Sequence, residues 1–286
     1  MKDVKMKILI YMIRLVGGVG SVMLEIKKEL EGRGHEVKII SREDDLKCFS
    51  TKDAFLKINR AVKNTSYDIL YTQDWSCALS LLFYKNHFVC FHGEEPKNKF
   101  FQTLLGKIKG EKLIVVGNKL KKRFPKSNLI YNGVNLQKFK PNPKIRRIKN
   151  SVGFANWTTE IYNFIRIKNA VKNMKKKFII AEGIEKEKMP EFYNKIEFFI
   201  IIPPKYTGFN LVWLEAMASG VQKIVGSNSG IGEKLPITKI EDYEGDIEKA
   251  ILNAKKRDYR KWILDNRFTW KDAADKLINV FEKNIK

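Results

Sequence analysis

Cysteine is scarce in this sequence, and the few cysteines are not spaced as ligands. The 286 residues include three, Cys48, Cys77 and Cys90, with no CxxC pair and no histidine at a metal-ligand spacing. Neither a disulfide framework nor a zinc site is therefore expected, and a reducing cytoplasm is the simplest compartment. Long apolar runs are also missing, since no stretch reaches the roughly 20 residues that span a bilayer. Charged residues interrupt residues 1–16, so no leader peptide is expected.

Several catalytic motifs are absent as well. The sequence has no DxD pair to hold a divalent metal, no Walker loop, and no Ser/His/Asp order typical of hydrolases. We therefore predict no metal site and no cofactor. If this protein releases a diphosphate, a helix N-terminus and basic side chains must stabilise its charge.

Acidic residues are rare in one long segment. Residues 97–149 contain sixteen lysines and arginines and a single acid, Glu111, within a chain of formal net charge +23. A focused positive field indicates an anionic partner, which could be a membrane phospholipid, a phosphorylated acceptor or nucleic acid. The alternative is that these lysines cover solvated faces and bind no partner. Neither interpretation identifies a reaction.

The residues that are present favour two α/β domains. Hydrophobic residues make up 44% of the chain, enough for two cores of ordinary size. Short apolar runs alternate with helical patterns, which is typical of a doubly wound parallel sheet. The expected strands are 7–12, 37–41, 67–71, 87–92, 113–116 and 128–131, and then, after a linker at 141–149, 152–154, 177–181 and 198–202.

The stretch 203–233 carries the strongest functional signal. It predicts the end of a buried strand, a helix that starts at Gly208, and a glycine stop at Ser219-Gly220. Backbone amides at such a helix start favour a phosphate. Glu215 lies in an apolar run of that helix, so its carboxylate needs a hydrogen-bonding partner. An anion site followed by a carboxylate is what a nucleotide sugar requires.

Two further positions are candidates on the first domain. Gly17, Gly18 and Gly20 follow the first strand and open a helix, but their GGxG spacing is not GxGxxG, so a tight structural turn is an equal alternative. His92 follows the fourth strand, at the sheet edge where ligands gather. It could hydrogen-bond a sugar or assist a leaving group, or it could simply pack in a turn.

Six stretches, taken in order, resemble one enzyme family. They are GGVG at 17–20, RGHEVKII at 33–40, YDILYTQDW at 67–75, FHG at 91–93, LIYNGVNLQKFKP at 129–141 and TGFNLVWLEAMASG at 207–220. In this order they resemble the retaining glycosyltransferases of the GT-B fold, in glycosyl transferases group 1 (family 4). The resemblance runs over nearly the whole chain.

The resemblance implies two Rossmann-like domains that face a cleft. Residues 1–140 would form the acceptor-side domain, residues 141–269 the nucleotide-sugar domain, and residues 270–286 a helix that crosses back to the first domain. His92 would be the active-site histidine near the transferred sugar. The implied donor-binding residues are Gly17, Gly18, Gly208, Phe209, Asn210 and Glu215, and we add Thr207, which stands where the family has an acid, and Lys205, which could supply positive charge.

The sequence departs from the family pattern at the sugar side of the site. The family has paired glutamates where this chain has Thr207 and Glu215, so the first acid is missing. The Arg and Lys that usually neutralise the diphosphate have no clear match, because the turn after residue 154 contains Thr158, Thr159 and Glu160. Lys205 or Arg14 could supply this charge, and Thr207 could cap the helix.

The expected function is transfer of a hexose from a nucleoside-diphosphate sugar to an acceptor, with retention at the anomeric carbon and without metal or cofactor. The acceptor would be anionic or lipid-linked. The protein would be cytoplasmic, with its basic first domain able to contact the inner face of a membrane. Two alternatives stay open: a non-catalytic GT-B protein that binds a nucleotide sugar or a partner subunit, and a basic nucleic-acid-binding protein. No recognition helix or aromatic RNP pattern supports the second alternative, so no nucleic acid partner is expected.

Overall fold

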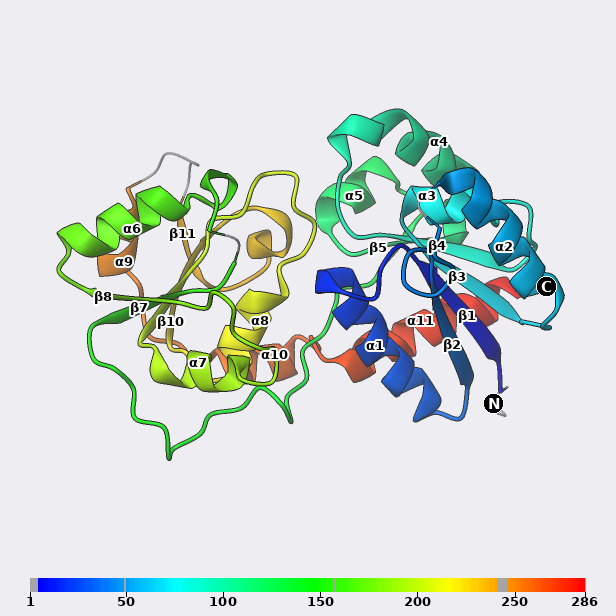
Figure 1. Ribbon diagram of the computed structural model, residues 1–286. Helices are drawn as coiled ribbons and strands as arrows, with labels where there is room; N and C mark the ends of the chain where they lie inside the picture. Colours follow the sequence, from blue (N-terminus) through cyan, green and yellow to red (C-terminus); the bar gives the residue numbers. More distant parts are fainter. Residues whose placement is uncertain (1–4, 49, 157, 241–245, 286) are drawn as a thin grey trace. The chain divides into compact units, whose positions relative to one another are not determined.

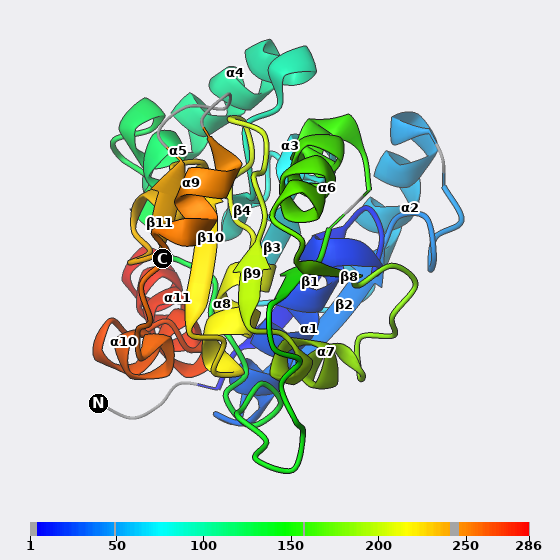
Figure 2. The same ribbon diagram turned by 90° about the vertical axis from the view of Figure 1, so that its left-hand side faces the viewer.

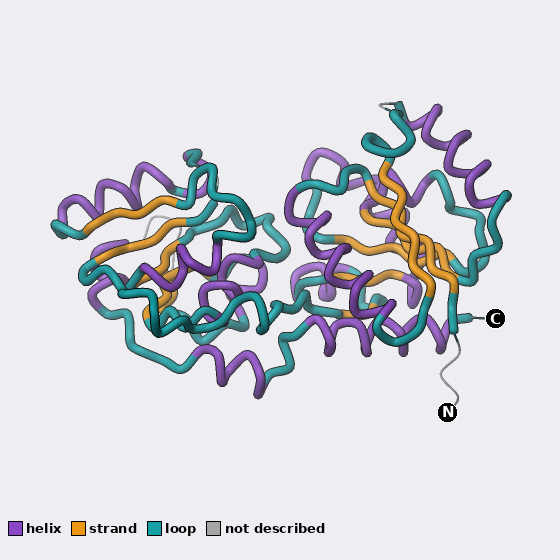
Figure 3. The backbone as a smooth tube through the Cα atoms, turned by 60° about the horizontal axis from the view of Figure 1, so that its bottom comes forward, coloured by secondary structure: helices purple, strands orange, loops and turns teal. Residues whose placement is uncertain are grey.

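A computed structural model of the chain describes residues 5–48, 50–156, 158–240 and 246–285. It divides into two compact units, Met1–Asn132 with Trp270–Lys286, and Gly133–Thr269. Each unit is a parallel β-sheet with helices on both faces (Figure 1). Figure 3 shows the strands of each unit, in orange, between purple helices. The two doubly wound sheets expected from the alternating pattern are confirmed.

The first unit contains a six-stranded sheet in the order β2-β1-β3-β4-β5-β6. Its strands are β1 (Lys7–Met12), β2 (Glu36–Ser41), β3 (Ile69–Gln73), β4 (His87–Phe91), β5 (Leu113–Val115) and β6 (Asn128–Leu129). All neighbouring pairs are parallel. The chain passes from β1 to β2 on one side and then back to β3 on the other. The carboxyl ends of β1 and β3 therefore form the switch point at which ligands bind in such sheets.

Helices cover both faces of this first sheet (Figure 1). One face carries α1 (Gly17–Glu31) and α11 (Trp270–Asn284), which contact each other. The other carries α2 (Thr51–Lys63), α3 (Asp74–Leu79), α4 (Lys99–Lys109) and α5 (Asn118–Arg123), with the short 3-10 helices η1 (Pro96–Asn98) and η2 (Gly110–Lys112) flanking α4. The helix expected at the end of the chain thus belongs to the first unit.

The α11 helix is fastened to the first unit by aromatic and ionic contacts. Phe281 is fully buried, with its ring centroid 5.5 Å from that of Tyr71 and 4.8 Å from that of Phe88. At the other end of the helix, Arg33 Nη2 lies 2.7 Å from Asp275 Oδ1. Apolar burial therefore supplies most of the attachment, because a partly exposed ion pair contributes little.

The α4 helix was not predicted from the sequence. Gly106 in its middle has the character of a helix breaker, since glycine costs about 1 kcal/mol there relative to alanine. The structure explains this glycine, because a Cβ at position 106 would lie 2.4 Å from the Phe124 ring. Close packing of α4 against Phe124, the residue after α5, thus requires a glycine at position 106, and that glycine weakens the helix signal in the sequence.

The second unit contains a five-stranded sheet in the order β11-β10-β9-β7-β8. Its strands are β7 (Ser151–Phe154), β8 (Lys177–Ile180), β9 (Phe198–Ile200), β10 (Lys223–Ser227) and β11 (Thr238–Ile240). Again all neighbouring pairs are parallel. The chain goes from β7 to β8 on one side and returns to β9 on the other. The switch point of this sheet therefore lies at the carboxyl ends of β7 and β9.

Helices also cover both faces of the second sheet (Figure 2). The α6 (Phe164–Asn173) and α9 (Ile247–Leu252) helices contact each other, and α8 (Leu211–Ala218) contacts both α7 (Met189–Lys195) and α10 (Tyr259–Asp265). Two further 3-10 helices are η3 (Glu160–Tyr162) and η4 (Gly230–Glu233). The α7 helix and β11 were not predicted from the sequence. No helix among the described residues is long and apolar enough to cross a membrane.

The segment 141–149 is not an interdomain linker, which corrects the prediction. The change of unit falls between Asn132 and Gly133, earlier than the expected boundary at residue 140. The predicted linker instead packs on the second unit, where Arg147 Nη1 donates to the Ile196 carbonyl over 3.1 Å and Ile148 N donates to the Lys195 carbonyl over 2.8 Å. Its positive charges, including Arg147, therefore belong to the second unit.

Candidate functional site

A pocket opens at the carboxyl ends of β7 and β8 in the second sheet. Its volume is about 430 Å³, within the range of small-molecule sites. The lining residues follow β7 and β8 and include the starts of α7 and α8. They are Ala155, Asn156, Thr158, Thr159, Ala181, Glu182, Gly183, Met189 and Val212. Small apolar walls with a few hydroxyl, amide and carboxylate groups suit a nucleoside, which has a flat base and a polar ribose.

Beside this pocket, Glu215 and Tyr193 form a hydrogen-bonded pair. The Tyr193 hydroxyl donates to Glu215 Oε2 over 2.9 Å, and Tyr193 is fully buried. Burial raises the pKa of Glu215, while the hydrogen bond from Tyr193 and the charges of Lys138 and Lys186 act to lower it. Tyr193 is therefore the polar partner that a carboxylate in an apolar helix requires.

The spacing of residues along α7 and α8 places the Glu215–Tyr193 pair near the pocket. Val212 lines the pocket from α8, and Glu215 follows three residues later on the same face. Met189 lines it from α7, and Tyr193 follows four residues later on that helix. Neither Glu215 nor Tyr193 lines the pocket itself, but each lies about one helical turn from a residue that does.

The loop before α8 differs from its prediction. The helix begins at Leu211 with Asn210 as N-cap residue, not at Gly208, and Thr207 does not cap it. Thr207 N donates instead to the Pro204 carbonyl over 3.0 Å. Three residues of loop separate Thr207 from the helix because Gly208 and Phe209 do not take up helical structure. Lys205 is exposed in the same loop.

A buried amide at the start of α8 lacks a partner. Asn210 is 8% exposed, and its side-chain Nδ2 has no hydrogen-bond acceptor among the residues that the structure describes. An unpaired buried donor is costly. At a helix N-terminus such a donor suits an anion, because the dipole already favours negative charge there.

The turn after β10 holds this loop in place. Gly230 has a φ of +55°, and a Cβ at this position would lie 2.6 Å from the Gly208 carbonyl oxygen. A side chain would therefore push the turn away from Thr207 and Gly208. The glycine-rich turn that ends the 203–233 stretch thus supports the candidate anion site.

In the first unit, Gly17 and Gly18 begin α1 with exposed backbone. Gly17 has a φ of +81°, and a Cβ on either glycine would meet no heavy atom within 4 Å. Gly20 differs, since its Cβ would lie 2.0 Å from the Leu15 carbonyl oxygen. The turn needs Gly20 for packing, whereas the first two glycines leave space for a ligand to approach the backbone.

The acids after β2 fix this glycine turn. Asp44 Oδ2 accepts a hydrogen bond of 2.8 Å from Leu15 N, and Glu43 pairs with Arg14 Nε. Arg14 is therefore engaged by a carboxylate in this structure, and the two acids act on the turn itself. A role for them in holding a ribose, as in a dinucleotide site, has no support from these contacts.

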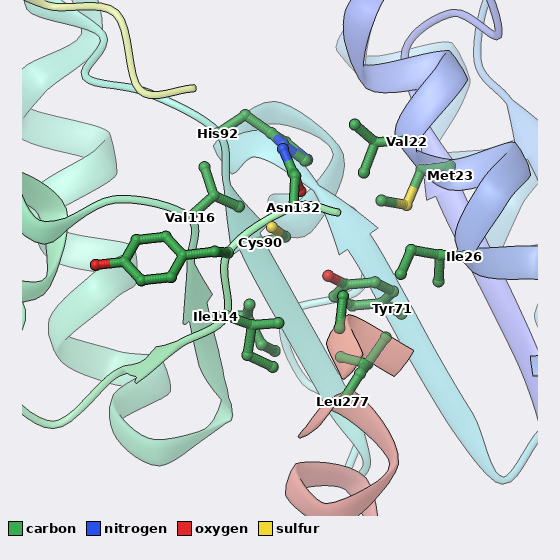
Figure 4. Close-up of a pocket in the computed structure, with 13 residues that line it drawn as sticks. Val22, Met23, Ile26, Tyr71, Cys90, His92, Ile114, Val116, Asn132 and Leu277 are labelled. Atoms are coloured by element: carbon green, nitrogen blue, oxygen red, sulfur yellow. The ribbon is translucent and has the colours of Figure 1, made fainter. Parts of the chain in front are cut away.

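His92 follows β4 and faces a small cavity (Figure 4). Its Nε2 lies 2.8 Å from Gln73 Oε1, an acceptor, so the imidazole N–H is on Nε2. Burial lowers the pKa of His92 to about 4, which makes the ring neutral at pH 7. The cavity, lined also by Val22, Tyr71 and Asn132, measures about 20 Å³. It takes one water molecule and not a sugar ring.

Asp74 is a further group at this edge of the first sheet. It follows β3 with a φ of +69°, a conformation that non-glycine residues rarely adopt. Burial, and then the nearby charge of Glu95, raise the pKa of Asp74 to about 7. Strain and a shifted pKa are common at functional sites. The sequence signal was its position at the end of a strand, within YTQDW.

The predicted site residues fall into two groups. Gly17, Gly18 and His92 lie at the carboxyl edge of the first sheet, and the residues from Lys205 to Asn210 with Glu215 lie near the carboxyl edge of the second. Sequence reasoning did not select Asn156, Glu182 or Tyr193. The first two follow β7 and β8 directly, so the strand-end rule could have found them. Tyr193 had no signal, since α7 itself was not expected.

Among the described residues, no group of three or more His, Cys, Asp or Glu side chains is arranged to hold a metal ion. Near the start of α8, the groups that an anion could meet include the backbone amides of that helix, Asn210 Nδ2 and the exposed Lys205.

Comparison with known proteins finds similar solved structures but no match by sequence. No protein-family model matches the sequence, and a search of curated proteins found no match. Solved structures do match. AviGT4, a glycosyltransferase involved in avilamycin A biosynthesis, has a TM-score of 0.72 and 9% identity, over 97% of this chain and 97% of that one.

Two nucleotide complexes also match over nearly their whole length. The catalytic domain of starch synthase IV from Arabidopsis thaliana, bound to ADP and acarbose, has a TM-score of 0.70 and 12% identity, covering 99% of this chain and 100% of that one. Anabaena Alr3699/HepE in complex with UDP-glucose has a TM-score of 0.61 and 14% identity, covering 98% and 96%. At these identities the likeness concerns the fold. The chain has the GT-B fold of these glycosyltransferase structures.

Proposed function

We propose that this protein is a retaining glycosyltransferase that moves a hexose from a nucleoside-diphosphate sugar to an acceptor, without a bound metal or cofactor. The observation that carries the proposal is the pocket at the carboxyl ends of β7 and β8, with the Glu215–Tyr193 pair about one helical turn from two of its lining residues. The GT-B fold supports it, and two structures of this fold were solved with ADP or UDP-glucose bound.

The nucleoside would occupy the pocket, and Glu215 would accept hydrogen bonds from the ribose hydroxyls. Burial raises the pKa of Glu215, and the hydrogen bond that Tyr193 donates to Oε2 acts to lower it. The diphosphate would lie at the start of α8, where the amides of Gly208, Phe209 and Asn210, the Asn210 Nδ2 donor and Lys205 supply positive potential. Thr207 would contact the sugar or its phosphate through a hydroxyl instead of the carboxylate found in the family pattern.

In the reaction, the bond between the anomeric carbon and the diphosphate oxygen breaks, and the diphosphate leaves with the electron pair. The acceptor oxygen then bonds to the anomeric carbon on the same face and gives its proton to the departing diphosphate. Neutral His92 carries its proton on Nε2 toward Gln73, so Nδ1 is an acceptor for a sugar hydroxyl. His92 would therefore position the donor sugar, and Gly17 and Gly18 would lie against the diphosphate.

The test begins with a thermal-shift screen of UDP-, GDP-, ADP- and TDP-sugars, because a ligand of the folded state raises its stability. Calorimetry on the binding donor then compares wild type with Glu215→Gln, which keeps an acceptor for Tyr193. Each charged hydrogen bond is worth about 1.5–3 kcal/mol, so affinity should fall at least tenfold. Glu191→Gln, on exposed α7 surface, is the control. Unchanged affinity in Glu215→Gln would remove the central claim.

The non-catalytic alternative keeps one supporting observation. The turn after β7 presents Thr158 and Thr159 to the pocket, and Thr207 replaces an acid, so the sugar side has fewer charges than the family pattern. Turnover decides between the two. Slow hydrolysis of the donor that binds would establish an enzyme, whereas binding with no turnover in the presence of a panel of acceptors would favour the alternative.

We further propose a cytoplasmic location and an anionic or lipid-linked acceptor. Ten of the sixteen basic residues between 97 and 149 precede residue 133 and thus belong to the first unit. Their field would favour a phosphate-bearing acceptor over a neutral one. Salt-sensitive binding to anionic vesicles, but not to DNA, would distinguish this partner from nucleic acid.

A further inference from the structure

The outward face of α4 is apolar. Phe100 is 72% exposed and Ile108 is 56% exposed, and both Phe101 and Leu104 are exposed between them. At about 100° per residue, positions 100, 101, 104 and 108 fall within an arc of about 100°. They therefore form one stripe along the helix, which we call the α4 stripe.

The opposite side of α4 is firmly attached to the first unit. Leu105 is buried in the cluster beneath α4, and Gly106 lies against the Phe124 ring. Arg123 of α5 donates to Gln102 Oε1 over 3.0 Å and to the Lys99 carbonyl over 3.1 Å. The α4 stripe is thus a second apolar surface, presented by a helix whose packing with the core is already complete.

A neighbouring turn extends this surface. Phe83 is 93% exposed, in the turn after α3. Lys109 Nζ, at the end of α4, donates to the carbonyl of Leu82 over 3.1 Å, so this turn lies against the helix. In Figure 1 and Figure 2, α4 occupies the outer side of the helical layer that includes α3 and α5. An exposed apolar surface of several large side chains usually marks an interaction site.

Lysines outnumber acids around the α4 stripe, where Glu94 and Glu95 precede η1 and Glu111 lies in η2. Residues 97–110 contain four lysines and no acid. The exposed lysines on α4, η1 and the neighbouring α5 region are Lys97, Lys99, Lys107, Lys119, Lys122 and Lys126, of which Lys119 pairs with Glu94. A helix with exposed aromatic and aliphatic residues beside lysines has the character of an interfacial helix, which lies in the plane of a membrane surface.

We propose that the α4 stripe binds the surface of an anionic lipid bilayer. Phe100, Leu104, Ile108 and Phe83 would enter the boundary between headgroups and acyl chains, and the lysines would contact lipid phosphates. A second copy of this chain fits the same surface less well. A two-fold contact would place two sets of these lysines together, and like charges facing each other are repulsive.

Binding of α4 to a membrane would bring the candidate site close to a lipid-linked acceptor; this consequence rests on the proposed function. Gln102 Nε2 on α4 donates to the Gly93 carbonyl over 2.9 Å, and Gly93 directly follows His92. The helix that contacts the membrane is thereby fastened to the strand end that carries the sugar-positioning histidine. An acceptor anchored in the same bilayer would remain close to that edge of the first sheet.

Vesicle co-sedimentation tests the proposal with the full chain and no sugar donor. The probes are phosphatidylcholine vesicles with and without about one-third phosphatidylglycerol. Wild type should bind the anionic vesicles and bind the neutral ones much more weakly. The Phe100→Ser/Ile108→Ser double variant should lose at least tenfold in partitioning, because burial of one large apolar side chain changes an equilibrium by about that factor. Lys99→Gln and Lys107→Gln should each cost about fivefold.

The matched control is Leu252→Ser, which alters a leucine that is 74% exposed in the second unit. Thermal unfolding should be unchanged in all variants, since every substituted side chain is exposed. Absent binding by wild type, equal binding by the double variant, or equal binding to neutral vesicles would overturn the proposal. So would light scattering that shows a wild-type dimer converted to monomer by Phe100→Ser, with no vesicle binding. Donor binding, measured separately, should be the same in these variants, so failure of the lipid proposal is distinct from failure of the proposed function.

Discussion

Replacing Tyr193 by phenylalanine tests the pair at the centre of the candidate site. The substitution keeps the buried ring, which packs 5.5 Å from Phe199 and 5.2 Å from Phe192 between centroids. It removes only the hydroxyl that donates to Glu215 over 2.9 Å. A hydrogen bond to a charged group contributes about 1.5–3 kcal/mol, so the free energy of unfolding of the second unit should fall by about 2 kcal/mol at pH 8.

The loss should depend on pH, and the sign follows from the pKa of Glu215. Burial already raises this pKa and the Tyr193 hydrogen bond lowers it. In Tyr193→Phe the pKa of Glu215 should therefore rise further. At acidic pH the carboxyl is protonated in both proteins, so the difference in stability should shrink as pH falls through the two pKa values.

Urea denaturation at several pH values measures both effects. With a typical slope of about 2 kcal/mol per molar urea, the midpoint should shift by about 1 M at pH 8. Tyr259→Phe removes a hydroxyl from another buried tyrosine of the same unit and is the control. A cycle with Glu215→Gln isolates the coupling between the two residues. Equal stability of Tyr193→Phe and wild type at pH 8, or a loss that is constant with pH, would refute this reasoning.

Two further predictions concern the first unit. Gly20→Ala should lower the free energy of unfolding by about 1–3 kcal/mol in thermal unfolding, because its Cβ would lie 2.0 Å from the Leu15 carbonyl oxygen. Gly18→Ala, whose Cβ meets open space, should keep the stability of wild type but weaken donor binding. Equal melting temperatures of the two variants would contradict this account. The pKa of Asp74 is raised to about 7 from 3.8. Between these pH values the folded state keeps a proton that the unfolded chain has lost. The free energy of unfolding therefore declines as pH rises, by up to about 1.4 kcal/mol per pH unit. Asp74→Asn should remove that decline. The effect of His92 should then remain, and it is opposite in sign, because its lowered pKa of about 4 makes the free energy of unfolding rise between pH 4 and 6.5. An unchanged pH profile of unfolding would show that Asp74 is not protonated as described.

All six strands of the first sheet and most strands of the second could be predicted from the sequence, because strands such as β1 and β4 are buried on both faces and appear as short apolar runs. The α4 helix could not, since its defining glycine is required by Phe124, which is distant in sequence. For the same reason the 141–149 segment resembled a linker. Its proline and arginine content is typical of linkers, whereas its packing depends on Ile196 and Lys195, which lie nearly fifty residues away.

The motif residues of the candidate site could be predicted from the sequence, but the residues that surround them could not. Glu215 could be recognised as a carboxylate in need of a partner, but its partner Tyr193 comes from a helix with no clear periodic signal. The exact start of α8 also escaped prediction. Gly208 resembles a helix start in sequence, yet α8 begins at Leu211, and Gly208 lies in a loop so close to Gly230 that a Cβ on Gly230 would lie 2.6 Å from the Gly208 carbonyl oxygen.

The position of α11 has a consequence for how the chain folds during synthesis. Phe281 fills the space between Tyr71 and Phe88, so the first unit cannot bury this aromatic surface until the helix Trp270–Asn284 leaves the ribosome. At about 5–20 residues per second, the interval between residue 132 and residue 284 is roughly 8–30 s. The second unit, whose residues are continuous in sequence, can finish folding first. During that interval the N-terminal sheet is a natural client for chaperones that bind exposed aromatic surface.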